Sequence, residues 1–481
     1  MKILLVAYMR LSGFDLVMKI PSLGLASIAA HLDRRYCSVK IVDLLIVSDK
    51  SRSYFQRLLK EYKPDVIGFS VITSHYFEAL KLAGIAKEYD QDTKVVFGGY
   101  HPTLDYDSVL RNDEAKTIDF VVRGEAEVSF SELIKALSMG QALDRVPNLS
   151  YREDGTIVHN PSHDLLDLDE IKLPDRSVRI NVKGSHMYGY PSDIVELSRG
   201  CPFNCSFCSS LSMYGRSYRK FSIERILADL KNLRRRGIKG IFVADHNVTA
   251  DPEWYKEVCE AIIDAGLGDL KFAVQASVAG IKQSPGLAET MAKSGVEWAL
   301  LGIESVSQDS LDFMQKEQFR DDDASEVVRE LKEHGMITMG TFIAGCPDDT
   351  EETVRANYEY AKRIGIDVAS FLTLTPYPNT PVRDELIGQN LVTNLHDYSI
   401  YDLWHANVRT KHLSSQQLFE LVMECNAKYM IDSGSIWRLV KRFPVYITGL
   451  IAQELIRNPR EALGHFKGLR NKSVGIKEQK S

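Results

Sequence analysis

The sequence predicts an α/β protein in which a Rossmann-like sheet is followed by a partial (β/α)6 TIM barrel and a helical C-terminal region. Two observations predict this fold class. Short apolar runs alternate with amphipathic helical segments over residues 1–140, and a second, more regular series begins at residue 194. The chain has 481 residues, which is enough for two or three domains.

The first unit, residues 1–140, carries the pattern of a doubly wound parallel sheet. Its apolar runs are short and continuous, as expected for strands that are buried on both faces. The predicted strands are 3–7, 39–43, 66–70 and 94–98. The predicted helices, from the helical spacing of apolar residues, are 23–32, 54–62 and 76–89.

Polar residues and glycines follow three strands of this unit, in the segments 70–75, 98–102 and 123–125. The carboxyl ends of parallel strands meet at one edge of a sheet, where open α/β folds bind ligands. We therefore expect these three turns to gather there. No G-x-G-x-x-G follows the first strand, so the sequence does not suggest a dinucleotide cofactor.

Residues 141–190 are predicted to form a linker that contains a hairpin. The segments 149–152 and 156–158 flank an Asp154-Gly155 turn. The acidic stretch 164–175 is typical of a linker.

Residues 191–395 are predicted to form the partial barrel, because six strand-and-helix units follow one another. The predicted strands are 194–198, 240–245, 270–276, 297–303, 338–344 and 368–374. The predicted helices are 222–236, 253–265, 285–294, 323–335 and 350–364. Six such units make three quarters of a TIM barrel, which is an open, curved parallel sheet.

The C-terminal region, residues 396–481, is predicted to be helical and ends in a basic segment with interleaved aromatic residues. Two interpretations stay open. We favour a cap that covers the barrel opening, and the alternative is a face that lies on an anionic membrane. Tyr401, Trp404 and His405 precede the basic segment and are placed to close over a substrate.

Composition and charge exclude several classes of protein. The formal net charge of −6 and the pI near 6.1 argue against a nucleic-acid partner. The apolar N-terminal run is too short to span a bilayer and lacks the cleavage site of a signal peptide. We expect a cytoplasmic protein, with a peripheral position at the membrane through the basic C-terminal helices as the alternative.

Three of the seven cysteines lie within eight residues, in Cys201-Pro-Phe-Asn-Cys205-Ser-Phe-Cys208. This concentration indicates a metal rather than a disulfide framework. Iron–sulfur clusters usually take four cysteines and structural zinc takes four protein ligands, so three thiolates leave one iron open. A zinc knuckle that borrows a histidine is the alternative, although no histidine lies within zinc-finger distance after Cys208.

The C-x3-C-x2-C pattern, with the aromatic Phe207 before its last cysteine, resembles the radical S-adenosylmethionine (SAM) family. The resemblance implies a [4Fe–4S] cluster on Cys201, Cys205 and Cys208, whose open iron chelates SAM and whose reduced form cleaves SAM to a 5′-deoxyadenosyl radical. Gly302-Ile-Glu304-Ser305 similarly resembles the Gly-x-Glu-Ser signature of that family. The residues implied to contact SAM are Phe207, Asp245, Asn247, Gln275, Ser277 and Glu304. For Asp245 and Asn247, a helix N-cap is an equal alternative.

The N-terminal unit, with Gly-Gly-x-His-Pro and Arg-Gly-Glu, resembles the cobalamin-binding domain of class B radical SAM enzymes. That group includes carbon methyltransferases and the anaerobic magnesium-protoporphyrin IX monomethyl ester cyclase. The residues implied to line cobalamin are Thr73, Ser74, His75, Gly98, Gly99, His101, Arg123, Gly124 and Glu125. The Asp-x-His-x-x-Gly motif that ligates cobalt in other cobalamin domains is absent, which leaves a vestigial domain as the alternative.

The resemblance implies two reactions that start with hydrogen abstraction. Methylation of an unactivated carbon is the first expectation, and oxidative cyclisation or another C–C or C–O rearrangement is the alternative. The expected substrate is a small molecule or a lipid- or porphyrin-like one, with flavodoxin or ferredoxin as electron donor. A methylthiotransferase is excluded because the N-terminal unit holds only Cys37, and Cys346 is interpreted as a packed thiol. No catalytic side chain is assigned.

Overall fold

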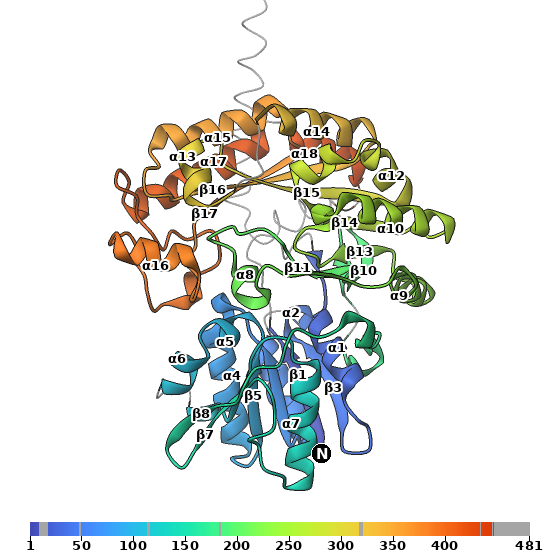
Figure 1. The fold of residues 1–481 in the computed structure, drawn as a ribbon, viewed down its shortest axis with the longest axis vertical. Coiled ribbons are helices and arrows are strands. Elements are labelled where there is room, and N and C mark those ends of the chain that lie inside the picture. Colours follow the sequence, from blue (N-terminus) through green and yellow to red (C-terminus); the bar gives the residue numbers. More distant parts are fainter. Residues whose placement is uncertain are drawn as a thin grey trace, which may run out of the picture.

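The structure is a computed structural model, and it describes residues 1–8, 18–47, 50–112, 116–181, 184–316, 321–432, 434–444 and 446. Figure 1 shows two α/β bodies, one formed by the blue and teal part of the chain and the other by the green to red part. The two bodies contact one another through α5 (Tyr100–Leu104) and α8 (Ser209–Tyr214).

The first body is built on a sheet with the strand order β3-β1-β4-β5-β6-β7-β8. Its strands are β1 (Lys2–Ala7), β3 (Ser38–Asp43), β4 (Val66–Ser70), β5 (Lys94–Gly98), β6 (Phe120–Val122), β7 (Leu149–Glu153) and β8 (Thr156–His159). The first five are parallel, whereas β7 and β8 pair antiparallel. Strands β4, β5 and β6 therefore end at one edge, each followed by one of the three predicted turns.

Helices cover both faces of this sheet. On one face, α1 (Leu23–His31) and α7 (Glu127–Met139) bury Leu25 and Phe130 against Leu5 and its neighbours. On the other face, α3 (Ser51–Tyr62) and α4 (Tyr76–Tyr89) bury Phe55 and Leu82 in a second cluster with Leu4. Successive residues of β1 thus enter opposite clusters, which is why the strand is apolar throughout. The shorter helices of this body are α2 (Leu44–Val47), α6 (Tyr106–Arg111) and the 3-10 turn η2 (Thr73–His75).

The second body is an open, curved sheet with the strand order β17-β16-β15-β14-β13-β10-β9-β2. Its strands are β2 (Met18–Lys19), β9 (His186–Met187), β10 (Tyr190–Val195), β13 (Gly240–Val243), β14 (Lys271–Ala276), β15 (Val296–Glu304), β16 (Ile337–Ala344) and β17 (Val368–Thr373). The six strands from β10 to β17 are parallel and follow chain order, as in a barrel that does not close.

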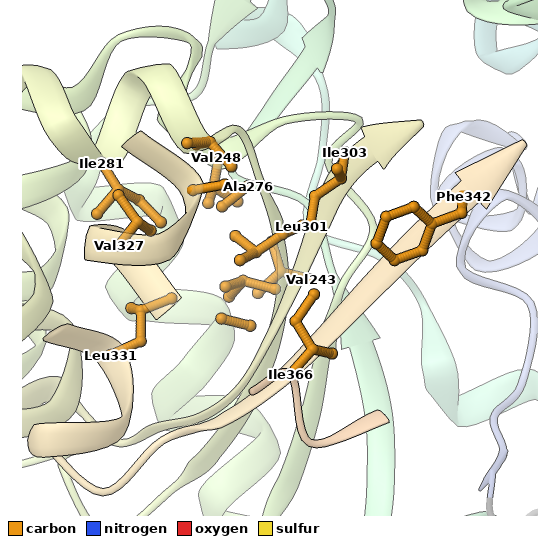
Figure 2. Packing of buried hydrophobic residues seen from close by; sticks show 14 of the residues in the cluster. Val243, Val248, Ala276, Ile281, Leu301, Ile303, Val327, Leu331, Phe342 and Ile366 are labelled. Carbon is orange, nitrogen blue, oxygen red and sulfur yellow. The ribbon is translucent and has the colours of Figure 1, made fainter. Parts of the chain in front are cut away.

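Helices cover the convex side of this sheet, as Figure 1 shows. They are α9 (Ile223–Arg235), α10 (Pro252–Asp264), α11 (Val278–Gln283), α12 (Leu287–Ser294), α13 (Gln308–Phe313), α14 (Asp321–Glu333), α15 (Glu351–Ile364) and α17 (Ser415–Asp432). Helix α16 (Pro381–Gly388) lies apart from these, and its Val382 N–H donates to the Ser206 carbonyl at 3.1 Å. Figure 2 shows Leu301 and Ile303 of β15 in one cluster with Val327 and Leu331 of α14. The strand residues that face outward therefore pack against the helices, and the residues that alternate with them face the barrel interior.

The predicted fold class is confirmed, with two differences in how the sheets are assembled. The hairpin expected in the linker forms β7 and β8, and it extends the first sheet because β7 pairs with β6. The short strands β2 and β9 pair antiparallel beside β10 and so bring residues 18–19 of the N-terminal unit into the second sheet. Strand pairing between segments distant in sequence leaves no local pattern that predicts it.

Helix α18 (Ser435–Arg442) lies at the amino ends of the barrel strands. Arg442 pairs with Glu297 at the start of β15 at 2.9 Å, and Arg438 pairs with Asp367, which precedes β17, also at 2.9 Å. The rest of the predicted basic segment, from residue 447 onward, lies outside the described residues. Across the part of the chain that the structure describes, every helix is too short or too polar to cross a bilayer.

Candidate functional site

The barrel encloses a cavity of about 620 Å³ whose lining changes from apolar to polar along the strands. The deepest layer joins Phe242, Ala273 and Trp298, which are aligned across β13, β14 and β15. One step further along the strands the lining holds Gln275, Leu300 and Met339, and beyond these it holds Ser277, Thr341 and Ser370. The carboxyl ends of the strands therefore present the polar groups, and the amino ends close the cavity with an apolar floor.

The cysteine loop lies at the polar end of this cavity, directly after the short strand β11 (Ser198–Gly200), which pairs with β12 (Tyr218–Lys220). Gly200 has φ +85°, and a Cβ there would lie 2.3 Å from the Ser217 carbonyl oxygen, so only glycine allows this entry into the loop. The Ser206 N–H donates to the Met314 carbonyl at 3.0 Å and the Ser206 hydroxyl to the Phe313 carbonyl at 3.1 Å. The loop is thus held against the end of α13.

All three predicted cluster cysteines line the cavity, and none has a disulfide partner. Burial raises the pKa of each thiol, to about 11 for Cys205. Metal binding must therefore displace their protons, as it does at cysteine sites generally. Among the described residues, no three histidine, cysteine, aspartate or glutamate side chains are grouped to hold a metal ion together. A [4Fe–4S] cluster does not require the thiols to converge on one ion, because each thiolate binds a different iron.

Five of the six residues predicted to contact SAM line the same cavity, and the sixth does not. The five are Phe207, Asn247, Gln275, Ser277 and Glu304. Asp245 is 1% exposed and accepts hydrogen bonds from the Leu197 N–H at 2.8 Å and from the Ser198 hydroxyl. Its carboxylate therefore joins β13 to the segment before the cysteine loop rather than facing the cavity. Burial raises the pKa of Asp245 to about 7.

Asn247 and Ser277 both begin short helical segments, which bears on the N-cap alternative. The Asn247 side chain accepts from the Thr249 N–H at 3.1 Å and from the Ser277 N–H at 3.1 Å. The Ser277 hydroxyl accepts from the Gly280 N–H at 3.2 Å as the N-cap of α11. Both residues thus cap helices at the rim of the cavity, and their contact with SAM stays a prediction.

Several residues at the cavity were not found from the sequence. Lys316 contacts Glu304, and Thr341 donates from its hydroxyl to the same carboxylate at 3.3 Å. Trp298 stacks on Tyr188 in the floor, with ring centroids 3.8 Å apart. No sequence motif marks these residues. Trp298 lies on the same face of β15 as Leu300 and Gly302, and Thr341 lies beside Gly302 on β16. Tyr401 and Trp404, which were expected near a substrate, also line the cavity.

A second cavity, of about 240 Å³, opens at the carboxyl edge of the first sheet. It runs between the sheet and helices α1 and α7, where Leu5, Val96 and Phe130 form apolar walls. Gly68 widens it, since a Cβ there would lie 2.8 Å from a methyl group of Leu5. Its far wall belongs to the second body and includes Glu196, Arg199 and Tyr214. We call this cavity the carboxyl-edge slot.

The residues predicted to line cobalamin divide into three groups. Gly98, Gly99, Gly124 and Glu125 line the carboxyl-edge slot, and Ser74 lines the barrel cavity. The others, which line neither cavity, are Thr73, His75, His101 and Arg123. Gly99 has φ +96°, and a Cβ there would lie 3.0 Å from the backbone N and O of Val71, so this turn requires glycine.

Three of these residues have positions in the protein that the sequence did not suggest. His101 is fully buried between the rings of Tyr76 and Tyr398, and burial lowers its pKa to about 3. Arg123 donates to the backbone carbonyls of Asn148 and Asn160. The imidazole of His75 packs edge-on against Tyr8, with centroids 5.5 Å apart. These side chains support the turns rather than face a cavity.

Glu125 takes part in a buried ion-pair network that joins the two bodies. Arg199 of β11 donates to Glu125 at 3.0 Å and to Glu127 at 2.7 Å, and Arg219 donates to Glu125 at 2.9 Å. The side chains of Arg199, Glu125 and Glu127 are each no more than 6% exposed. Glu125 was expected to line cobalamin. It lines the carboxyl-edge slot, and its carboxylate also joins the second body to the first.

Cys346, which we interpreted as a packed thiol, is 2% exposed, and its Sγ donates to the Ser310 carbonyl at 3.8 Å. Burial raises its pKa well above the ordinary value. A thiol in that position stays protonated and unreactive.

Comparison with known proteins agrees with this geometry. The model of the B12 binding domain matches residues 11–134, and the model of the Radical SAM superfamily matches residues 195–361. An uncharacterized methyltransferase of Pyrococcus horikoshii is 33% identical over 413 residues, which cover 85% of this chain and 88% of that protein. The anaerobic magnesium-protoporphyrin IX monomethyl ester cyclase of Rubrivivax gelatinosus is 28% identical over 88% of this chain and 76% of its own. The hopanoid C-3 methylase of Methylococcus capsulatus is 27% identical over 87% of this chain and 78% of its own.

Solved structures show the same fold. The radical SAM methyltransferase TsrM from Kitasatospora setae, with cobalamin and a [4Fe–4S] cluster bound, aligns with a TM-score of 0.67 and 19% identity, over 80% of this chain and 75% of its own. The cobalamin-dependent SAM radical enzyme OxsB, with aqua-cobalamin and SAM bound, aligns with a TM-score of 0.72 and 17% identity, over 98% of this chain and 75% of its own. The chain is a radical SAM enzyme, and it belongs to the group of that superfamily whose barrel follows an N-terminal B12-binding domain.

Proposed function

We propose that this enzyme methylates an unactivated carbon, using a [4Fe–4S] cluster, SAM and cobalamin. The observation that carries the proposal is that the barrel cavity and the carboxyl-edge slot meet at one pair of side chains. Tyr100 lines the slot, His246 lines the barrel cavity, and the Tyr100 hydroxyl lies 2.8 Å from His246 Nε2. A methyl donor held at the edge of the first sheet therefore lies next to a substrate held in the barrel.

The residues present fit the three groups. The cysteines at the polar end of the barrel cavity, Cys201, Cys205 and Cys208, would hold the cluster. Gln275, Ser277 and Glu304, at the strand ends beside them, would hold the polar parts of SAM. The carboxyl-edge slot is too small for a whole corrin, but its apolar walls suit the base of a nucleotide tail. The corrin would then lie at the mouth of the slot, against the turns at Ser74 and Gly99.

When bound, the cluster and SAM supply a 5′-deoxyadenosyl radical and cobalamin supplies a methyl group, and the protein contributes position and exclusion of water. Phe242, Trp298 and Met339 would hold the substrate by apolar contact below the SAM site. Tyr377, Tyr401 and Trp404 would cover it at the strand ends. Burial lowers the pKa of His246 to about 4, so its imidazole stays neutral beside Tyr100 and adds no cation between the two cavities.

The apolar floor supports a lipid- or porphyrin-like substrate, which is the class that the sequence suggested. Two relatives named above act, by their names, on a hopanoid and on magnesium-protoporphyrin IX monomethyl ester. A substrate with an apolar ring system would bury its surface against Phe242, Trp298 and Leu300, and each Å² of apolar surface buried would contribute about 25 cal/mol of favourable binding free energy. An external one-electron donor of the flavodoxin or ferredoxin class would reduce the cluster.

Oxidative cyclisation is the second candidate function, and the relationship to the magnesium-protoporphyrin cyclase favours it. The same barrel cavity and the same radical would serve it. The two functions differ in whether cobalamin transfers a methyl group to the substrate.

The test is anaerobic reconstitution with iron and sulfide, followed by hydroxocobalamin, SAM, a reductant and a panel of hopene and porphyrin substrates. Stoichiometric corrinoid together with both 5′-deoxyadenosine and S-adenosylhomocysteine supports methylation. Deoxyadenosine with a cyclised or rearranged product and no methylated one supports cyclisation. A protein with its full iron content that releases neither SAM product contradicts the proposal.

Two pairs of variants assign the sites. Cys205→Ser should lose the cluster's visible absorbance and most of its iron, whereas Cys346→Ser, at a buried thiol outside the cavity, should keep both. Gly24 lines the carboxyl-edge slot, and a Cβ there would have nothing within 4 Å, so Gly24→Phe should fill the slot and lose bound corrinoid while it keeps the cluster. Gly84→Phe, also in open space but on α4, should retain corrinoid.

A further inference from the structure

Lys316 places a partly buried positive charge beside Glu304 in the cavity that the cysteine loop lines. Its Nζ lies 3.1 Å from Glu304 Oε1, and the two side chains are 17% and 9% exposed. Both residues line the barrel cavity together with the three cysteines. Lys316 belongs to no motif of the sequence, and the proposed function gives it no role.

The backbone around Glu304 is shaped to accept this pair. Gly302 faces it, and a Cβ there would lie 2.6 Å from Glu304 Oε1 and 3.2 Å from Lys316 Nζ. Glu304 itself has φ +68°, a left-handed conformation that costs energy for a residue with a side chain. Thr341 donates to its second oxygen at 3.3 Å. The absence of a side chain at Gly302, the left-handed backbone of Glu304 and the hydrogen bond from Thr341 together hold the Glu304 carboxylate in one position.

Lys316 is also held at a set position relative to the cysteines. The backbone N–H of Lys316 donates to the Leu311 carbonyl of α13 at 2.9 Å. The preceding residue, Gln315, accepts from Asn204 of the cysteine loop at 2.7 Å. With the two bonds from Ser206 to α13, the loop and the lysine form one hydrogen-bonded unit.

Lys316 shares one cavity with all three cysteines. The loop that carries the cysteines is hydrogen-bonded to the segment that carries Lys316, and the ammonium of Lys316 lies 3.1 Å from Glu304 Oε1 in that cavity. A unit charge in this position is within electrostatic reach of the site that would hold the cluster.

We propose that Lys316 is a positioning residue with two effects: it holds Glu304 in place, and it stabilises the reduced form of the cluster. Reduction takes one electron from the donor into the cluster, with no bond formed or broken and no proton moved. It therefore adds one negative charge to a buried site, and a nearby cation offsets that charge. The inference rests on the cluster part of the proposed function and is independent of cobalamin and of the substrate.

The test is the midpoint potential of the reconstituted cluster, measured without SAM by dithionite titration and electron paramagnetic resonance. Lys316→Met should shift the potential to a more negative value, and Lys316→Arg should stay near the wild type. Glu304→Gln, which removes the anion and keeps the lysine, should shift it in the opposite direction. Lys282→Met is the matched control, because Lys282 pairs with Glu326 on the surface and should leave the potential unchanged.

The outcomes separate this inference from the proposed function. If the wild-type protein takes up no cluster, the proposed function fails. If it takes up the cluster and Lys316→Met has the wild-type potential at full iron content, the role of Lys316 is overturned. If Lys316→Met does not fold or loses the cluster, the double variant Lys316→Met/Glu304→Gln, which removes both charges of the pair, decides. A potential more negative than that of Glu304→Gln alone supports the inference, and an equal or less negative one overturns it.

Discussion

Asp245 shows how burial decides the availability of a polar side chain near the site. It comes just after β13 beside the barrel cavity, where a carboxylate would suit the ammonium group of SAM. Both of its oxygens nevertheless accept hydrogen bonds from residues 197 and 198. A carboxyl group buried among such donors stabilises the segment that leads into the cysteine loop, and it titrates far from its ordinary pKa.

Asp245→Asn should flatten the pH dependence of stability between about pH 4 and pH 7. Burial raises the folded pKa of Asp245 to about 7, against about 3.9 in the unfolded chain. The folded state therefore binds more protons in that window, so this carboxyl makes the free energy of unfolding decrease as pH rises, by about 1 kcal/mol per pH unit. The asparagine variant should lose that slope.

Urea unfolding at several pH values measures the effect. Asp269→Asn is the control, since Asp269 is half exposed and pairs with Arg234 on the surface. A variant Asp245→Asn with the same slope as the wild type would show that this carboxyl stays ionised in the folded protein.

At the scale of single elements, the turns after the strands depend on glycines for which the structure supplies the reason. The turn after β5 passes close to the backbone at Val71, and the loop after β11 passes close to Ser217. In both places φ is positive and a side chain has no room. By contrast, Gly84 lies within helix α4 with nothing within 4 Å of a Cβ.

Gly99→Ala should reduce the free energy of unfolding by about 1–3 kcal/mol, because alanine has to adopt φ +96° and contact the Val71 backbone. Gly84→Ala should instead increase it by about 0.5–1 kcal/mol, because alanine favours the helix interior. Urea unfolding of the two variants checks the difference in sign. Equal effects at the two positions would contradict the strain assigned to the turn after β5.

At the scale of the whole molecule, the two bodies are joined by buried charges as well as by packing. Arg199, from the segment that leads into the cysteine loop, is enclosed by Glu125, Glu127 and Glu196. The same residues form one wall of the carboxyl-edge slot. The network therefore sets the distance between the cysteine loop and the edge of the first sheet.

Arg199→Met should reduce the free energy of unfolding by about 3–5 kcal/mol, because it leaves Glu125 and Glu127 buried without their shared partner. It should also speed proteolysis between the two bodies. Arg234→Met removes an exposed pair with Asp269 at 3.2 Å and should change stability by no more than about 1 kcal/mol. Urea unfolding and limited trypsin digestion of both variants compare a buried pair with an exposed one. Equal losses would show that the network adds nothing to the joint.

By itself, the sequence determined the two α/β units, the succession of strands and helices along each of them, and the cysteine loop, because each of these depends on residues that are neighbours in the chain. The alternation of apolar residues, the lengths of the strands and the spacing of Cys201, Cys205 and Cys208 are local patterns, and a local pattern can be identified in the sequence alone. The turns at Gly99 and Gly124 were placed at the correct edge for the same reason.

Only the tertiary structure decided which polar residues face a cavity and which are used to join elements. Lys316 meets Glu304, and Glu125 meets Arg199, through contacts between separate strands, loops and bodies. Asp245 and His101 had the right position in the sequence for a ligand, and packing turned them away from the cavities. The physical reason is that a buried charge or polar group takes the partner that folding brings to it, and the sequence around it does not record which partner that is.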